Sequence, residues 1–198
     1  MRVFKFGGAS VKGAEGVKNV LQVLEKVGYK DTLIVVSAMG KTTNALEAVV
    51  KNYFDKSKEL LASVQDVKKY HNQILLDLFD NEQHIVFKNI NNLFLQLEQF
   101  LHQNKSPNYN YVYDQIVSFG EIISTTIVSA YLNEKGIDNE WIDARTLIKT
   151  DNTYRDALVN WDTTLKQIQK IGKKKQLYVT QGFIGSDDNH FTTTLGRE

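Results

Sequence analysis

The chain opens with a strand, a glycine-rich turn, a helix and a second strand, and this order most constrains its fold. Residues 2–6 are rich in β-forming side chains and end at two glycines. Apolar residues at helical spacing then predict a helix over residues 12–29. Residues 32–37 form a continuous apolar run of the kind that is buried on both faces of a parallel sheet. The sequence therefore predicts a βαβ unit and an α/β fold.

A long helical region follows this unit. From Thr43 to about Gln103 the pattern is almost entirely helical, with a polar break at Asp80-Asn81, and Pro107 marks the loop that ends the region. The later segments are predicted as helices over 111–135 and 161–171 and strands over 140–142, 176–180 and within 190–195. Strands that alternate with helices favour a three-layer α/β/α sandwich with a largely parallel sheet, interrupted by a helical insertion at about 43–105.

Composition excludes several functional classes. The 198 residues carry a formal net charge of +1, which gives no electrostatic case for nucleic acid or an anionic membrane as a partner. The lack of cysteine excludes a disulfide scaffold, a thiolate zinc site and a cysteine nucleophile, and it fits a reducing compartment. No uninterrupted apolar run reaches 18 residues, so we expect no transmembrane helix. The four histidines lack metal-ligand spacing, and we expect no metal-binding residue in this chain.

Two polar turns follow the first two predicted strands. In residues 5–10, KFGGAS, a lysine and two glycines precede a helix, which suits an anion, although a plain tight turn with a surface lysine has the same pattern. Residues 37–44, SAMGKTTN, contain Gly-Lys-Thr, but Val35 stands where a P-loop needs glycine. This second turn suits an anionic ligand or an ordinary helix N-cap.

Two further motifs combine glycine with polar residues. Ser118–Glu121 places a glycine inside a helical pattern, at a cost of about 1 kcal/mol relative to alanine, and either close helix packing or a nearby ligand explains it. Glu121 suits an amine better than a phosphate, because carboxylate and phosphate repel. Thr180–Gly185 and Thr192–Arg197 follow the last predicted strands. Ligands of open α/β sheets bind at the carboxyl ends of strands, so these turns are expected to converge.

Together these motifs resemble the aspartate kinases of the amino-acid kinase family, which phosphorylate the side-chain carboxylate of aspartate. Six motifs occur in family order: KFGGAS at 5–10, VSAMGKTTN at 36–44, SFGEIIST at 118–125, DAR at 143–145, TQGFIG at 180–185 and TTTLGR at 192–197.

The resemblance implies the amino-acid kinase fold, ATP with Mg²⁺ as phosphoryl donor and L-aspartate as acceptor. The product would be 4-phospho-L-aspartate, in the first step of lysine, threonine and methionine biosynthesis. It further implies catalysis by Lys5, phosphate binding by Lys5, Gly7, Gly8, Ser10 and Ser37, and aspartate binding by Thr43, Glu121 and Arg197.

The chain also departs from the family pattern. Ala9 replaces a threonine, and Glu198 stands where the family has glycine. The family continues with a nucleotide-binding half and regulatory domains, so residues 1–198 are expected to be the amino-terminal, amino-acid-binding part of a catalytic domain, inactive alone. The full-length form is expected to be a cytoplasmic homo-oligomer. Two alternatives stay open: a kinase for another small acid, or a non-catalytic aspartate-binding or assembly module.

Overall fold

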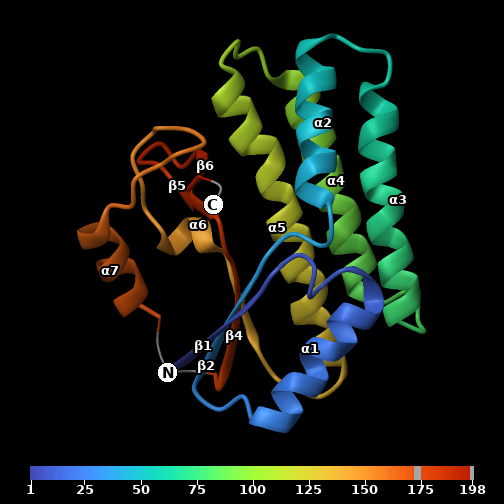
Figure 1. Ribbon diagram of the computed structural model, residues 1–198, viewed down its shortest axis with the longest axis vertical. Helices are drawn as coiled ribbons and strands as arrows, with labels where there is room; N and C mark the ends of the chain where they lie inside the picture. The colour runs from blue at the N-terminus through green and yellow to red at the C-terminus, as the bar shows by residue number, and fades with distance from the viewer. Residues whose placement is uncertain (172–174, 197–198) are drawn as a thin grey trace.

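A four-stranded parallel sheet forms the centre of the molecule (Figure 1). The computed structural model describes residues 1–171 and 175–196. The sheet has the order β1-β2-β4-β3, and its strands are β1 (Arg2–Phe6), β2 (Thr32–Val36), β4 (Leu177–Gln181) and β3 (Glu140–Ile142). All its pairings are parallel. Helix α1 (Gly13–Val27) connects β1 to its neighbour β2, which is the predicted βαβ opening.

The region between β2 and β3 is mainly helical, as predicted. It contains α2 (Thr42–Phe54), α3 (Leu60–Leu78), α4 (Ile85–Gln103) and α5 (Tyr109–Glu134). The predicted break near Asp80 is present between α3 and α4. A second break after α2 was not predicted, because no glycine or proline marks it; the backbone turns there at Lys56, whose φ is 50°.

Short elements complete the fold. They are α6 (Ala144–Leu147), α7 (Trp161–Gln169) and an antiparallel pair of β5 (Ile184–Ser186) and β6 (Thr192–Thr194). The sequence pattern missed α6 and β5, which are too short to show periodicity. In Figure 1 the strands lie between α7 on one side and helices α1–α5 on the other, the layer order of the predicted α/β/α sandwich.

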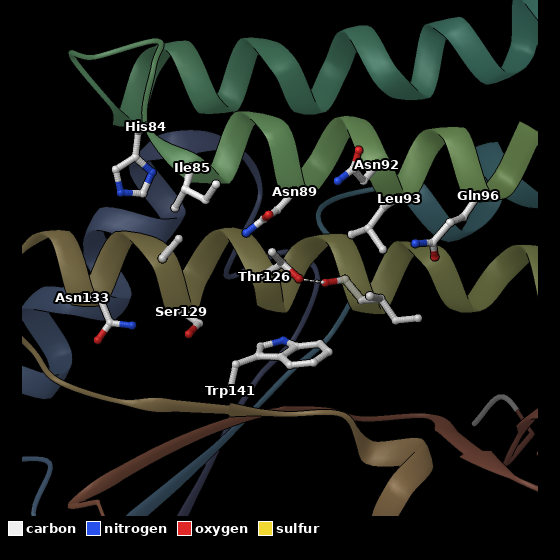
Figure 2. Close-up of a pocket in the computed structure, with 12 residues that line it drawn as sticks. His84, Ile85, Asn89, Asn92, Leu93, Gln96, Thr126, Ser129, Asn133 and Trp141 are labelled. Carbon is white, nitrogen blue, oxygen red and sulfur yellow. Dashed lines mark hydrogen bonds between the residues drawn. The ribbon is translucent and has the colours of Figure 1, made fainter.

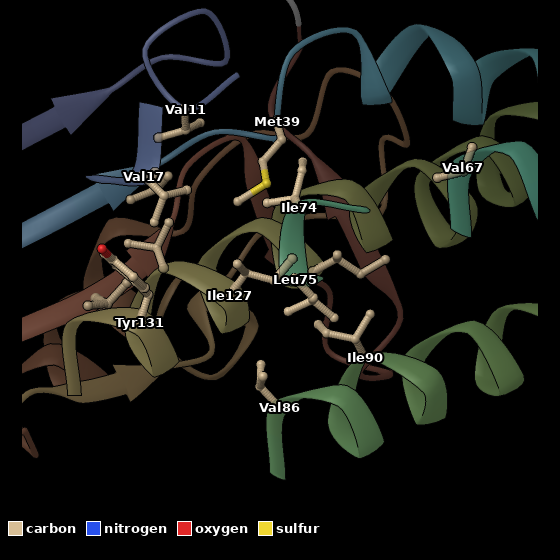
Figure 3. Close-up of a cluster of buried hydrophobic side chains, with 14 of the residues drawn as sticks. Val11, Val17, Met39, Val67, Ile74, Leu75, Val86, Ile90, Ile127 and Tyr131 are labelled. Carbon is tan, nitrogen blue, oxygen red and sulfur yellow. The ribbon is translucent and has the colours of Figure 1, made fainter. Parts of the chain in front are cut away.

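The core lies where the sheet meets helices α1 to α5. Figure 3 shows Val17 of α1, Met39 of the β2–α2 turn, Leu75 of α3 and Ile127 of α5 gathered in one cluster, and each is fully buried. The apolar stripes of the helices explain the burial of Val17, Leu75 and Ile127, and Met39 joins them from the turn. The sheet and the helical region are thus joined by one hydrophobic core.

Helix α5 is the central helix of this core. It has 26 residues and is long and apolar enough to cross a membrane by length and composition alone, but 78% of its most apolar window is buried inside the protein. Packing against the sheet, α2 and α4 therefore accounts for its apolar character. Because it passes both the core and the strand ends, α5 also carries side chains of the candidate site.

Candidate active site

The carboxyl ends of three strands meet at one edge of the sheet. Phe6 pairs with Val36, and Val36 pairs with Gln181, so β1, β2 and β4 end at the same level. A cavity of about 400 Å³ lies beyond these ends and is lined by Lys5, Ser37, Thr43, Glu121, Gly182, Phe183, Leu195 and Gly196. The expected convergence of the polar turns is therefore present.

The first turn contributes Lys5 and a closely packed glycine. Lys5 is exposed and faces the cavity from β1. A Cβ on Gly8 would lie 2.6 Å from the carbonyl oxygen of Ala38, so only glycine lets the two turns touch. A Cβ on Gly7 would meet no atom within 4 Å. Gly8 thus serves packing, whereas Gly7 borders open space.

The second turn is held in place from both sides. The amide of Ser37 donates to the carbonyl of Phe6 at 3.0 Å, and the hydroxyl of Ser124 in α5 donates to the carbonyl of Ser37 at 2.7 Å. Thr43 lies in the first turn of α2. The N-terminus of a helix carries a partial positive charge, so α2 and Lys5 together make this side of the cavity favourable for an anion.

Glu121 brings a carboxylate to the same cavity. Its side chain is buried, and its Oε2 has no hydrogen-bond partner. Burial raises the pKa of Glu121 from 4.5 to about 7, although a hydrogen bond from the Ala38 backbone and the charge of Lys5 lower it. A buried carboxylate oxygen without a donor is costly, and a ligand ammonium group would supply a donor to Oε2.

The glycine beside Glu121 has a packing role. A Cβ on Gly120 would lie 3.1–3.3 Å from side-chain atoms of Ala38, Thr42 and Leu46. The structure therefore favours close helix packing as the reason for this glycine, whereas the next residue, Glu121, lines the cavity.

The remaining wall was only partly foreseen. Gly182 and Phe183 follow β4, and Leu195 and Gly196 follow β6. The sequence motifs predict that these segments reach the strand ends, but they do not identify the four residues as site residues. Phe183 has a φ of 66° and accepts a hydrogen bond from the amide of Leu195 at 2.9 Å, so the two segments form one wall. Their positions directly after strand ends were the signal that could have found them.

The cavity brings together four of the predicted residues: Lys5, Ser37, Thr43 and Glu121. Gly7, Gly8 and Ser10 lie in the adjacent turn and do not line it, and the amide of Ser10 is bonded to the carbonyl of Gly7. Arg197 lies outside the described residues.

A larger cavity of about 570 Å³ lies between α4 and α5 (Figure 2). Amide and apolar side chains line it, including Asn89, Asn92 and Trp141, and its lining contains no Lys, Arg, Asp or Glu. Its lining therefore has no carboxylate for an amine, and its one titratable side chain, His84, is a cation only when protonated. The cavity at the strand ends is smaller, but its charged side chains make it the better candidate for the functional site.

The chain is similar in sequence to a known family and to several of its members. The sequence model of the amino acid kinase family matches residues 1–197. Similar proteins include the aspartokinase of Chlamydia pneumoniae, 29% identical over 98% of this chain and 41% of its own length, and aspartokinase 2 of Arabidopsis thaliana, 31% identical over 98% of this chain and 37% of its own length. The bifunctional aspartokinase/homoserine dehydrogenase 1 of Arabidopsis is 27% identical, and the chain covers 22% of it.

Solved structures show the same fold. Aspartokinase III of Escherichia coli, solved in complex with lysine and aspartate, matches all of this chain with a TM-score of 0.87 at 24% identity, and the match covers 44% of that protein. The chain thus spans less than half the length of these relatives. The profile match over nearly all its residues and the shared fold place the chain in the amino acid kinase family.

Proposed function

We propose that the cavity at the strand ends binds L-aspartate, and that the chain is the amino-acid-binding part of an ATP-dependent aspartate kinase. One observation carries this proposal: the buried carboxylate of Glu121, whose Oε2 has no hydrogen-bond partner, shares a cavity with Lys5 and the N-terminus of α2. Glu121 suits an ammonium group, and Lys5 with the N-terminus of α2 suits anionic groups. An amino acid with a second carboxylate presents both kinds of group, and two similar structures contain aspartate.

The proposed reaction needs positioning and charge stabilisation more than proton transfer. A side-chain carboxylate of aspartate is already an anion, so its oxygen can attack the γ-phosphorus of ATP, the bond to ADP breaks, and 4-phospho-L-aspartate forms. Repulsion between the carboxylate and the phosphates is the main obstacle. Lys5 and the backbone amides at the start of α2 oppose it, and Glu121 orients the ammonium group.

The roles of the other residues follow the family resemblance. Thr43 and Arg197 are proposed to hold a carboxylate of aspartate, for which a guanidinium fork is suited. Gly7, Gly8, Ser10 and Ser37 are proposed to border the phosphates. The open space at Gly7 supports that placement.

Membership of this family implies ATP as donor, commonly with Mg²⁺. Lys5 and the α2 N-terminus fit phosphate groups. The described residues contain no group of three or more His, Cys, Asp or Glu that could hold a metal ion, so these residues offer no protein cage for Mg²⁺. We therefore assign no step of the reaction to a protein-held metal.

We further propose that the 198-residue chain binds aspartate without turning it over, because it spans less than half of its relatives. ADP release that depends on both ATP and L-aspartate, measured with the purified chain, would contradict this. The first step of lysine, threonine and methionine biosynthesis, a homo-oligomeric full-length form and a cytoplasmic location belong to the same proposal.

Calorimetric titration tests the proposed ligand. We expect L-aspartate to bind, and succinate, which lacks the ammonium group, to bind at least about tenfold more weakly. Glu121→Gln should remove most of that difference, whereas Glu82→Gln, which changes an exposed glutamate, should leave it intact. Stronger binding of L-glutamate would favour another small acid as acceptor. Failure of the folded chain to bind any of these ligands would refute the proposal.

A further inference from the structure

A line of buried polar side chains runs along one face of α5. Asp114, Ser118, Glu121 and Thr125 are all buried, and their spacing of four, three and four residues places them on the same face of the helix. A buried helix face is normally apolar. Glu121 is explained by the cavity, but Asp114 lies two turns away, about 10 Å along the axis.

Asp114 is bonded to two distant segments. Its Oδ2 accepts hydrogen bonds from the amide of Thr194 at 2.8 Å and the amide of Arg155 at 3.0 Å. Its Oδ1 accepts from the hydroxyl of Thr194 at 2.8 Å. Burial raises the pKa of Asp114 to about 6, and these bonds oppose that shift. Three hydrogen-bond donors therefore stabilise the buried carboxylate, and the carboxylate in turn satisfies these donors.

The neighbouring side chain, Gln115, binds the same strand. Its Nε2 donates to the carbonyl of Thr192 at 2.8 Å, and its Oε1 accepts from the amide of Thr192 at 3.1 Å. A neighbouring strand would satisfy the same two backbone groups. Asp114 and Gln115 therefore occupy one edge of β6, while β5 pairs with its other edge.

The strand that Asp114 and Gln115 hold, β6, continues directly into the wall of the cavity. The residues after β6 are Leu195 and Gly196, which form part of the cavity wall. Gly196 has a φ of 83°, and a Cβ there would lie 2.9 Å from Oδ1 of Asp156, next to the segment that Asp114 holds through Arg155. A shift of β6 would move this wall relative to Glu121, which is fixed in α5 itself.

We propose that Asp114 and Gln115 are positioning residues that set the distance between the Leu195–Gly196 wall and Glu121, and thereby the affinity of the cavity for its amino acid. The inference rests on the proposed function for the identity of the ligand, but not for the attachment itself. Neither residue lines the cavity, so both act through β6.

Two readouts on the 198-residue chain test this role separately. Amide hydrogen exchange of Thr192 and Thr194 reports the attachment, and calorimetry with L-aspartate reports its consequence. The variants are Asp114→Ala, Asp114→Asn and Gln115→Ala, with Gln99→Ala on exposed α4 surface as the matched control.

We expect Asp114→Ala and Gln115→Ala to speed exchange of these amides at least about tenfold and to weaken aspartate binding at least about tenfold. Asp114→Asn keeps an oxygen acceptor for both amides, and its Nδ2 can donate to the Thr194 hydroxyl. It should therefore restore most of the affinity that Asp114→Ala loses, and Gln99→Ala should change neither readout.

If the amides of Thr192 and Thr194 exchange at unchanged rates in folded Asp114→Ala or Gln115→Ala, these side chains do not hold β6 in place. Faster exchange with unchanged affinity would overturn the positioning role. If Asp114→Ala does not fold, Gln115→Ala decides alone, because Gln115 is half-buried and carries no charge. Lack of aspartate binding by the wild-type chain would instead refute the proposed function, and the exchange rates would still decide whether the attachment exists.

Discussion

The charged carboxylate of Glu121 suits a bound ammonium group, but without a ligand it lowers the stability of the folded protein. Its carboxylate is buried with one oxygen unpartnered, and its pKa is raised to about 7. The folded protein therefore binds a proton more tightly at this position than the unfolded chain does. An ammonium group in the cavity would reverse this effect, because it favours the charged carboxylate.

Aspartate affinity should consequently depend on pH. With a pKa of about 7, Glu121 is mostly charged at pH 8 and mostly protonated at pH 6. If only the charged form binds the ammonium group, the dissociation constant should be about tenfold larger at pH 6 than at pH 8. Calorimetry across this range measures the effect. Affinity independent of pH in this range would remove Glu121 from ammonium binding, and Glu121→Gln should abolish the dependence.

The same residue should limit stability above neutral pH. The folded pKa of Glu121 lies above its unfolded value of 4.5, so its contribution to the free energy of unfolding falls as pH rises from about 4.5 to 7. Glu121→Gln removes the buried charge and should raise the free energy of unfolding at pH 8 by about 1–3 kcal/mol. Urea denaturation of both proteins at pH 8 and pH 5 checks this, and the gain should shrink at pH 5. A loss of stability at pH 8 would show that the hydrogen bond from the Ala38 backbone and the charge of Lys5 outweigh the cost of burying the carboxylate.

The two glycine-rich turns bring separate elements into contact. The β1–α1 turn meets the β2–α2 turn at Gly8, whose carbonyl accepts from the amide of Gly40 at 2.9 Å. This contact fixes Lys5 and the start of α2 on the same side of the cavity. Gly7, one residue earlier, makes no such contact.

Alanine substitutions at these two positions form a matched pair. In Gly8→Ala the new Cβ would lie 2.6 Å from a backbone oxygen, so the turns must separate, and the free energy of unfolding should fall by about 1–3 kcal/mol. Gly7→Ala should change it by less than about 0.5 kcal/mol. Thermal or denaturant unfolding distinguishes the two. Equal effects on stability would mean that the contact between the turns contributes little.

For the whole molecule, the predictable features are those that depend on local sequence. The βαβ opening follows from two β-forming runs, a glycine pair and a helical stripe. The convergence of Lys5 and Ser37 follows from the rule that parallel strands end at one edge, whereas Glu121, inside α5, is predicted at the site only by its family motif.

The remaining features depend on contacts between distant residues. Asp114 meets Thr194 across 80 positions, and nothing in the local pattern distinguishes this aspartate from a solvent-exposed one. Similarly, the alternatives for Gly120 could be separated only once Leu46 and Ala38 were seen against it. Elements of three or four residues, such as β5 and α6, have no measurable periodicity and are stabilised by tertiary contacts.

The central claim is that an amino acid with two carboxylates binds where the strands end. Titration of the ¹⁵N-labelled chain with L-aspartate tests it most directly, because every backbone amide reports separately. We predict chemical-shift changes centred on Ser37, Thr43, Glu121 and Gly182, with little change at Asn89 and Asn92 of the larger cavity. Changes centred on that larger cavity, or none at saturating L-aspartate, would contradict it.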